Sequence, residues 1–163
     1  MANSSWNIYN FRMPLIEKLL AQGNELVVVA PVDEYINYLQ ELDGVRHVPL
    51  KSLSRRSLNP LGSLQLIIEL FKIYKRERPD LLIHYTHKPN ILGGVPAWML
   101  GIKSIAVVTG LGYAFIREGW LNRMTRVLYR LASRFHDKII FEMRMIFNTL
   151  LVRKFQKNTS LQA

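Results

Sequence analysis

The fold class is indicated most clearly by the segment Leu81-Leu82-Ile83-His84-Tyr85-Thr86-His87-Lys88-Pro89-Asn90. Its first five residues are apolar enough for a short buried strand, and the polar residues that follow lead into a helix. That helix is predicted to begin at Pro89 and to end at Leu100, because Gly101 stops it. A strand, a polar turn and a helix together form the unit from which parallel sheets are built.

The same alternation continues along the chain in both directions. The sequence predicts strands at 25–30, 46–50, 81–85, 103–108 and 138–142, and helices at 14–22, 33–42, 60–78, 89–100 and 120–135. Strands that alternate with helices in this way favour a parallel sheet with helices on both faces. We therefore predict the α/β class and a Rossmann-like, doubly wound parallel sheet.

The bulk composition agrees with a domain of this kind. The chain has 163 residues, of which 49% are hydrophobic, and this is enough to bury a core. It contains no cysteine, which excludes disulfides and thiolate metal sites. Its apolar runs are much shorter than the roughly 20 residues of a membrane-spanning helix. The first residues do not resemble a secretory signal, so we expect a cytoplasmic protein.

The net charge indicates an anionic partner. The chain has 22 Lys and Arg residues against 12 Asp and Glu residues, which gives a formal charge of +10. Nucleic acid, anionic lipid and a phosphorylated substrate would all be attracted by such a charge. No nucleic-acid-binding motif accompanies it, so we expect no nucleic acid.

Much of this positive charge lies in the helix predicted at 120–135. Arg123, Arg126 and Arg130 recur at steps of three and four residues, and Trp120 begins the segment. An amphipathic basic helix of this type can bind an anionic membrane surface through its cations and a nearby aromatic ring. We predict that role for these four residues; the alternative is a solvated outer face of a packed helix.

His87 is the candidate catalytic residue. It follows the strand predicted at 81–85, so it is expected at the carboxyl edge of the sheet, where folds of this kind bind ligands. A histidine at that edge can move a proton or hold a hydroxyl group. His84, in contrast, lies within the strand and is predicted to be a neutral core side chain.

Two further segments have features of ligand sites. The sequence predicts that 4–14 is a polar loop that runs into a helix N-terminus, where free N–H groups favour a phosphate. The segment 109–113 places two glycines after the strand predicted at 103–108, where the backbone can approach a ligand closely. An ordinary turn is the alternative explanation for both segments.

Several short segments resemble family-four glycosyltransferases that assemble glycans on undecaprenyl diphosphate, and they occur in the same order as in that family. The similarity covers residues 1–142 and is greatest to the group that adds N-acetylgalactosamine to lipid-linked diacetylbacillosamine. The segments that carry it are Ile8-Tyr9-Asn10-Phe11-Arg12-Met13-Pro14, Ala30-Pro31-Val32-Asp33-Glu34-Tyr35, Ser54-Arg55-Arg56-Ser57-Leu58-Asn59-Pro60, His87-Lys88-Pro89-Asn90, Gly110-Leu111-Gly112 and Ile140-Phe141-Glu142.

The resemblance implies that the chain is one half of a GT-B fold. In that fold the first domain holds the acceptor and a second domain binds a nucleotide sugar as donor substrate. Transfer retains the anomeric configuration and needs neither a metal nor another cofactor. His87 then matches the histidine near the reacting sugar, and the residues expected to bind substrate in the cleft are Asn10, Arg12, Lys88, Asn90, Gly110, Gly112 and Tyr113.

The same resemblance implies the partners and the location. The acceptor is expected to be a lipid-linked saccharide, used in the synthesis of capsule, lipopolysaccharide or glycoprotein. The protein would therefore lie peripherally at the inner face of the cytoplasmic membrane. A separate chain that carries the donor domain is a further expected partner.

The sequence departs from the family pattern at both ends. No strand precedes Met1-Ala2-Asn3, so the first and central strand of the sheet is expected to be missing. After Phe141-Glu142 the family pattern stops, and we attribute the tail at 143–163 to a frameshift caused by a single-base deletion. The expected parts are thus a family domain at 1–142 and a poorly packed tail.

These departures indicate a truncated fragment that is inactive in sugar transfer without a donor-binding half. Two alternatives remain open at this point. The chain could be the acceptor-side subunit of a two-chain glycosyltransferase, or a non-catalytic module that binds a membrane or a protein partner.

Overall fold

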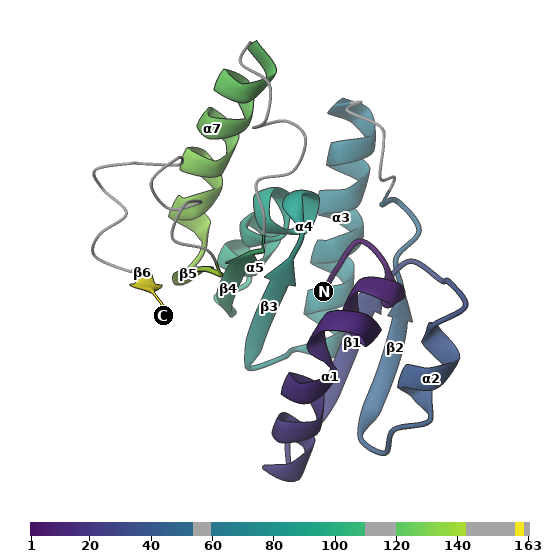
Figure 1. Cartoon of the computed structure of the whole chain (residues 1–163). Coiled ribbons are helices and arrows are strands. Elements are labelled where there is room, and N and C mark those ends of the chain that lie inside the picture. Colours follow the sequence, from purple (N-terminus) through teal and green to yellow (C-terminus); the bar gives the residue numbers. More distant parts are fainter. Residues whose placement is uncertain (54–59, 110–119, 143–158, 162–163) are drawn as a thin grey trace. The chain divides into compact units, whose positions relative to one another are not determined.

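The computed structural model describes residues 1–53, 60–109, 120–142 and 159–161. The chain divides into two compact units, Met1–Glu69 and Leu70–Ala163. Figure 1 shows the helices and strands of both units with their labels. The units are described separately below.

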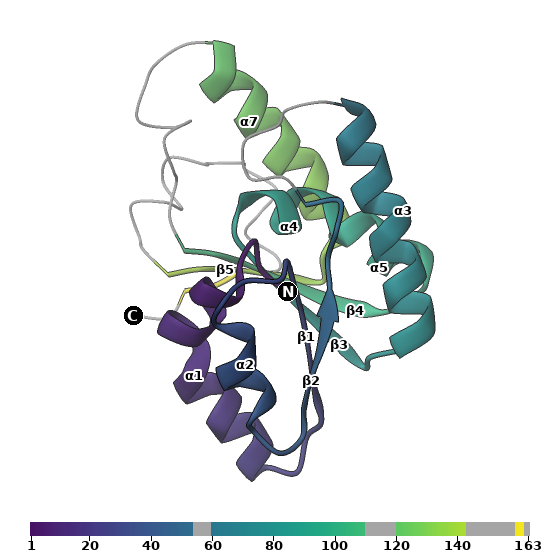
Figure 2. The ribbon, with the colours of Figure 1, turned by 90° about the vertical axis from the view of Figure 1, so that its right-hand side faces the viewer.

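The first unit is a small parallel sheet with two helices. Its elements in chain order are α1 (Ser5–Ala21), β1 (Leu26–Ala30), α2 (Ile36–Gln40) and β2 (Val45–Pro49). The two strands pair in parallel, with Leu26 opposite Val45 and Ala30 opposite Pro49. Both helices pack against these strands and against one another (Figure 2). The apolar side chains that they cover form the core of this unit.

The start of α1 differs from the prediction. The sequence predicts a polar loop up to Pro14, whereas the helix begins at Ser5 and contains Pro14. The prediction was wrong because the first turn is capped from two sides. The Ser4 hydroxyl accepts a hydrogen bond from the Asn7 nitrogen at 3.2 Å, and the Asp33 carboxylate accepts one from the Ser5 nitrogen at 2.8 Å. Because of these caps, the helix begins at Ser5, well before Pro14, although proline usually occupies the first turn of a helix.

The second unit is a four-stranded sheet, and all of its strands are parallel. Helix α3 (Pro60–Glu77) leads into it from the first unit. The strand order is β3-β4-β5-β6. The remaining elements are β3 (Leu81–Tyr85), α4 (His87–Leu92), α5 (Gly94–Met99), β4 (Lys103–Val108), α7 (Trp120–Ala132), the 3-10 turn η1 (Ser133–Phe135), β5 (Lys138–Phe141) and β6 (Thr159–Leu161).

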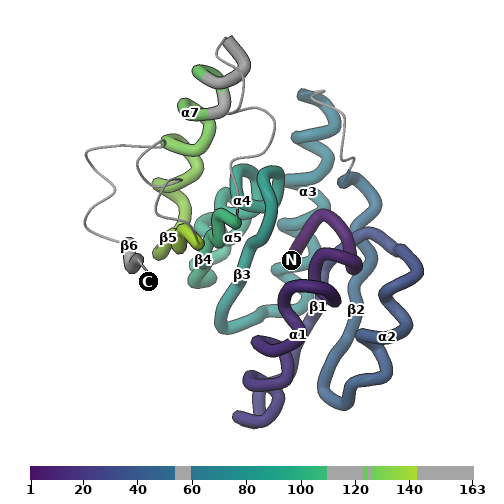
Figure 3. Tube along the Cα trace, viewed as in Figure 1, coloured from purple at the N-terminus to yellow at the C-terminus, as the bar shows by residue number. Residues whose placement is uncertain are grey.

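Helices α4 and α5 replace the single helix predicted at 89–100. The break falls at Gly93, and Pro96 explains it, since proline has no N–H to donate to the carbonyl of Leu92. Helix α4 packs on β3, β4 and α7, whereas α5 packs on β4 and η1. The first turn of α4 follows directly on the carboxyl end of β3 (Figure 3).

The class and the strand direction predicted from the sequence are confirmed: strands alternate with helices, and every strand pair is parallel. The described strands fall into two sheets, β1-β2 and β3-β4-β5-β6. Strand β6 lies in the tail and pairs with β5, with Ile139 opposite Thr159, although the sequence predicts no strand there. The boundary at residue 142 and the missing first strand stay predictions. Among the described residues, no helix is long and apolar enough to span a membrane.

Candidate active site

The carboxyl end of β3 carries the residues at the centre of the candidate site. His87 lies directly beyond the strand, as the sequence predicts. It is the first residue of α4, which begins two residues before the predicted start at Pro89. Thr86 joins the two elements with φ 69° and ψ 162°, a conformation that favours glycine. Its hydroxyl is buried and has no hydrogen-bond partner within the described residues. A strained backbone therefore precedes the candidate catalytic histidine.

His87 is held by a tyrosine from a distant helix. Its Nδ1 lies 2.7 Å from the hydroxyl oxygen of Tyr129 on α7, and the two rings meet edge to face with centroids 6.0 Å apart. Burial lowers the pKa of His87, because the charged imidazolium loses water there. His87 is accordingly a neutral imidazole at neutral pH, which suits either proton transfer or a hydrogen bond to a hydroxyl.

Asn90 anchors α4 to the sheet. Its side-chain amide donates to the carbonyl oxygen of Val107 at 2.8 Å, and its own carbonyl accepts from Nε2 of His136 at 2.8 Å. The residue is buried, with only 2% of its surface exposed. In this structure Asn90 holds the position of the His87 turn, and its predicted contact with substrate stays a prediction.

Lys88 lies beside His87 in the first turn of α4. The side chain is half-buried, and desolvation lowers its pKa. Its position brings a cation next to the candidate catalytic histidine. The structure therefore places His87, Lys88 and Asn90 together on one short helix at the carboxyl edge of β3.

Behind this helix lie two buried histidines. His84 is fully buried, which confirms the prediction of a core side chain, and its Nε2 lies 2.8 Å from the Tyr74 hydroxyl. Its ring packs against that of His136 with centroids 5.2 Å apart. The Nδ1 of His136 in turn lies 3.0 Å from the Ser104 hydroxyl. Burial lowers the pKa of both histidines, so both are neutral.

Sequence reasoning missed His136 and Tyr129. Tyr129 lies in the helix whose arginine spacing indicates membrane binding, and no spacing pattern includes His136. Both residues reach α4 only through tertiary packing. For Tyr129 the available signal was general: a tyrosine on the buried face of a helix needs a partner for its hydroxyl group.

The candidates in the first unit lie on a helix and not in a loop. Asn10 is exposed on α1 and donates from its side chain to the carbonyl of Trp6 at 2.9 Å, whereas Arg12 is half-buried. The predicted phosphate site at the start of this helix needs correction. The Asp33 carboxylate already accepts from the nitrogens of Ser5 and Trp6, at 2.8 and 3.2 Å, and thus occupies the position left for an anion. Substrate contacts of Asn10 and Arg12 stay predictions.

The remaining predicted residues are described only in part. Gly110, Gly112 and Tyr113 lie outside the described residues, as does the side chain of Trp120. The arginines predicted to bind a membrane are exposed along α7: Arg123, Arg126 and Arg130. Apolar side chains beside them are also accessible, at 47%, 36% and 45% exposure for Val127, Leu128 and Leu131. Helix α7 thus combines an exposed surface of cations and apolar groups with the buried Tyr129.

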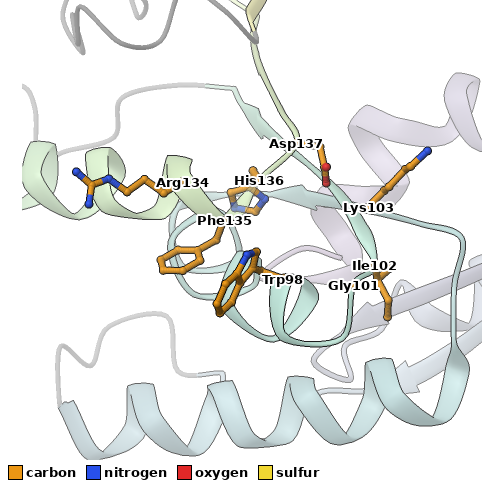
Figure 4. A pocket seen from close by; sticks show the side chains of 8 residues that line it. All are labelled: Trp98, Gly101, Ile102, Lys103, Arg134, Phe135, His136 and Asp137. Atoms are coloured by element: carbon orange, nitrogen blue, oxygen red, sulfur yellow. The ribbon is translucent and has the colours of Figure 1, made fainter.

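A shallow hollow of ≈ 190 Å³ lies at the opposite edge of the same sheet, at the amino end of β4 (Figure 4). Trp98 and Phe135 form its aromatic wall, with ring centroids 5.6 Å apart, and Lys103 and Arg134 also line it. None of the residues that line this hollow belongs to the predicted substrate site. Among the described residues, no group of three or more His, Asp or Glu side chains could hold a metal ion.

A match over most of the chain identifies its family. Residues 1–143 match the family described as Glycosyl transferase 4-like. The chain belongs to this family of glycosyltransferases. One relative is the N,N'-diacetylbacillosaminyl-diphospho-undecaprenol alpha-1,3-N-acetylgalactosaminyltransferase of Campylobacter jejuni, which is 34% identical over 146 residues. The aligned region is 86% of this chain and 38% of that glycosyltransferase, so the chain spans well under half of the relative's length.

Solved structures of other proteins share the fold of this chain. MurG of Acinetobacter baumannii superposes with a TM-score of 0.62 at 14% identity, over 99% of this chain and 44% of MurG. The UDP-GlcNAc 2-epimerase of Methanocaldococcus jannaschii gives a TM-score of 0.61 at 16% identity, over 92% of this chain and 41% of the epimerase. Both comparisons confirm the Rossmann-like α/β fold of the GT-B type.

Proposed function

We propose that this chain is the acceptor-binding half of a glycosyltransferase that moves a sugar from a nucleotide sugar to a saccharide carried on undecaprenyl diphosphate. The observation that supports this most directly is the 34% identity to the Campylobacter transferase, whose name includes such a lipid-linked acceptor. The family match extends over residues 1–143 and therefore includes His87. The chain corresponds to 38% of that relative, so the donor-binding half is assigned to sequence outside these residues.

In this proposal His87 contacts the reacting sugars. Its side chain is neutral and follows the carboxyl end of β3, where parallel α/β sheets bind ligands. Lys88 adds a cation that suits the diphosphate of the acceptor. Retention of the anomeric configuration and independence from metal ions are parts of the proposal that follow from the family resemblance. The chain alone is expected to bind the acceptor without transferring sugar.

Helix α7 is proposed to hold the protein at the inner face of the cytoplasmic membrane. Arg123, Arg126 and Arg130 are exposed, and each cation near an anionic lipid surface contributes about 1 kcal/mol of attraction. The accessible side chains of Val127, Leu128 and Leu131 can enter the interfacial layer of the lipid. A lipid-linked acceptor resides at such a surface, so membrane binding and acceptor binding would act together.

Acceptor binding by the purified 163-residue chain tests the function directly. Vesicles that contain an undecaprenyl diphosphate-linked saccharide are compared with vesicles that contain undecaprenyl diphosphate alone, and the bound fraction is measured by flotation. We expect tighter binding to the saccharide vesicles, and His87→Ala should weaken that difference about tenfold because one hydrogen bond to a desolvated partner is lost.

The matched control is His47→Ala, which removes a histidine of the first unit whose Nε2 lies 2.9 Å from the Ala30 carbonyl oxygen. This variant should bind both kinds of vesicle as the wild type does. Equal binding of the wild-type chain to both vesicles would contradict acceptor recognition. Transfer of a labelled sugar from a nucleotide donor by this chain alone would contradict its assignment as half of an enzyme.

A further inference from the structure

We propose that Tyr129 is a positioning residue that keeps the imidazole proton of His87 on Nε2, so that His87 donates a hydrogen bond to the bound sugar instead of removing a proton from it. The inference rests on the proposed function for the identity of the ligand. The contact between Tyr129 and His87 itself is a property of this chain and can be measured without any substrate.

The two side chains form a short and well-enclosed contact. The Tyr129 hydroxyl and Nδ1 of His87 are 2.7 Å apart, and the residues are separated by 42 positions in the sequence. Tyr129 is 5% exposed, so its hydroxyl cannot exchange its partner for bulk water. Helix α4 packs on α7, which holds both rings in place. Nδ1 is thus committed to the tyrosine, and Nε2 is the ring nitrogen left for a ligand.

The direction of this hydrogen bond follows from the surroundings of the tyrosine oxygen. The Asn90 side chain also hydrogen-bonds with the Tyr129 hydroxyl, and it lowers the tyrosine pKa against the larger upward effect of burial. The amide oxygen of Asn90 is buried and has no hydrogen-bond partner among the described residues, so the bond to the tyrosine oxygen comes from the amide N–H. The tyrosine proton is then directed to the other neighbour, Nδ1 of His87.

Asn90 is itself fixed in this orientation. One N–H of its amide donates to the Val107 carbonyl at 2.8 Å, which identifies the nitrogen end of the side chain and leaves a second N–H for Tyr129. The main-chain carbonyl of Asn90 is held by His136. The amide cannot rotate by half a turn without placing its oxygen against the Val107 carbonyl.

The consequence for His87 is a defined tautomer. A neutral imidazole carries one proton, and a ring nitrogen that accepts from Tyr129 cannot also hold it. Nε2 therefore bears the proton and can donate to a sugar hydroxyl or ring oxygen. The opposite tautomer would direct two protons at each other in the buried contact with Tyr129, or would displace the Asn90 amide.

Nuclear magnetic resonance of the full chain labelled with ¹⁵N-histidine tests the tautomer. We expect Nδ1 of His87 to resonate as an unprotonated, hydrogen-bond-accepting nitrogen and Nε2 as a protonated one. Tyr129→Phe removes the hydroxyl but keeps the ring, and it should give a mixture of both tautomers at His87. The spectrum of the wild-type chain decides the assignment even if this variant fails to fold.

Tyr74→Phe is the matched control, because it removes the hydroxyl that lies 2.8 Å from Nε2 of the other buried histidine, His84. It should change the signals of His84 and leave those of His87 as they are. A protonated Nδ1 on His87 in the wild type, or an unchanged tautomer in Tyr129→Phe, would overturn the inference.

The saccharide vesicles test the role of the positioned histidine. Tyr129→Phe should weaken saccharide-dependent binding about threefold, which is less than the effect of His87→Ala. The Nε2–H group of His87 that donates to the sugar is still formed in this variant, but only in part of the molecules. If the wild-type chain shows the expected tautomer but no saccharide-dependent vesicle binding, the proposed acceptor function and the contact of His87 with the sugar are both wrong. Intact wild-type binding with the opposite tautomer would overturn the role of Tyr129 alone.

Discussion

Gly93 lies directly against the ring of His84: a Cβ atom added to the glycine would be 2.5 Å from Nε2 of the histidine. The next residue has the same relation to the other buried histidine, since a Cβ on Gly94 would be 2.7 Å from Nε2 of His136. Such distances are far inside van der Waals contact. The two glycines let the junction of α4 and α5 approach the histidines that support the candidate site.

Gly93→Ala should therefore destabilise the chain by about 2 kcal/mol, since neither His84 nor the nearby carbonyl of Pro89, 2.7 Å from the added Cβ, is free to move. Urea denaturation measures the change. The control is Gly62→Ala in α3, where nothing lies within 4 Å of the added atom, and which should stabilise the helix by up to about 1 kcal/mol. A similar gain in stability in both variants would mean that helix propensity, and not the ring contact, decides the effect.

The buried histidines predict a loss of stability in acid. Burial lowers the pKa of His84, His87 and His136 in the folded chain, whereas the unfolded value is 6.5. Below about pH 6.5 the unfolded chain binds protons that the folded chain does not, so the free energy of unfolding falls as the pH falls. Each histidine adds up to about 1.4 kcal/mol per pH unit.

The measurement is urea denaturation between about pH 7.5 and 5.5. His136→Gln retains an amide that can donate to the Asn90 carbonyl but does not titrate, so it should make the slope of stability against pH shallower. Gly62→Ala should shift the stability without a change of slope. A slope in His136→Gln equal to that of the wild type would exclude a contribution from this histidine.

Replacing Thr86 by glycine should have opposite effects on thermal stability and on saccharide-dependent vesicle binding. The Thr86 backbone has φ 69°, which costs a β-branched residue about 1 kcal/mol or more, so Thr86→Gly should raise the thermal stability. The same change frees the backbone before His87 and should weaken saccharide-dependent vesicle binding about threefold. Arg78→Gly relieves a second positive φ, 45°, away from α4, and should leave binding unchanged. Tighter binding in Thr86→Gly would mean that the strained turn does not serve the site.

Membrane binding through α7 predicts a result that depends on position and not only on total charge. Changing Arg123, Arg126 and Arg130 together to glutamate should lower flotation with phosphatidylglycerol vesicles about a hundredfold, since three cations at about 1 kcal/mol each are lost. A matched charge reversal on exposed residues of other helices, at Lys18, Lys72 and Lys75, should have a much smaller effect. Equal losses of flotation in the two variants would mean that the net charge of the chain, and not the position of the arginines on α7, attracts it to the vesicles.

The position of His87 illustrates how much the sequence can predict. A run of apolar residues at 81–85 followed by polar residues places His87 beyond the strand, and the structure agrees because burial and hydrogen bonding within a parallel sheet depend on this local pattern. The start of α1 illustrates the opposite. Its first turn is capped by Asp33, which follows β1 and is remote in sequence, so the local pattern around Pro14 favoured a later start.

The class of fold and the parallel direction of the strands can be predicted from the order of hydrophobic and polar residues along the chain, and the family from short segments of specific residues. The groups that surround His87 are known only from the folded structure. Tyr129 and His136 come from segments far along the chain, and their partners are selected by helix packing and by the need to satisfy buried polar atoms. Such contacts leave no spacing in the sequence from which they could be predicted.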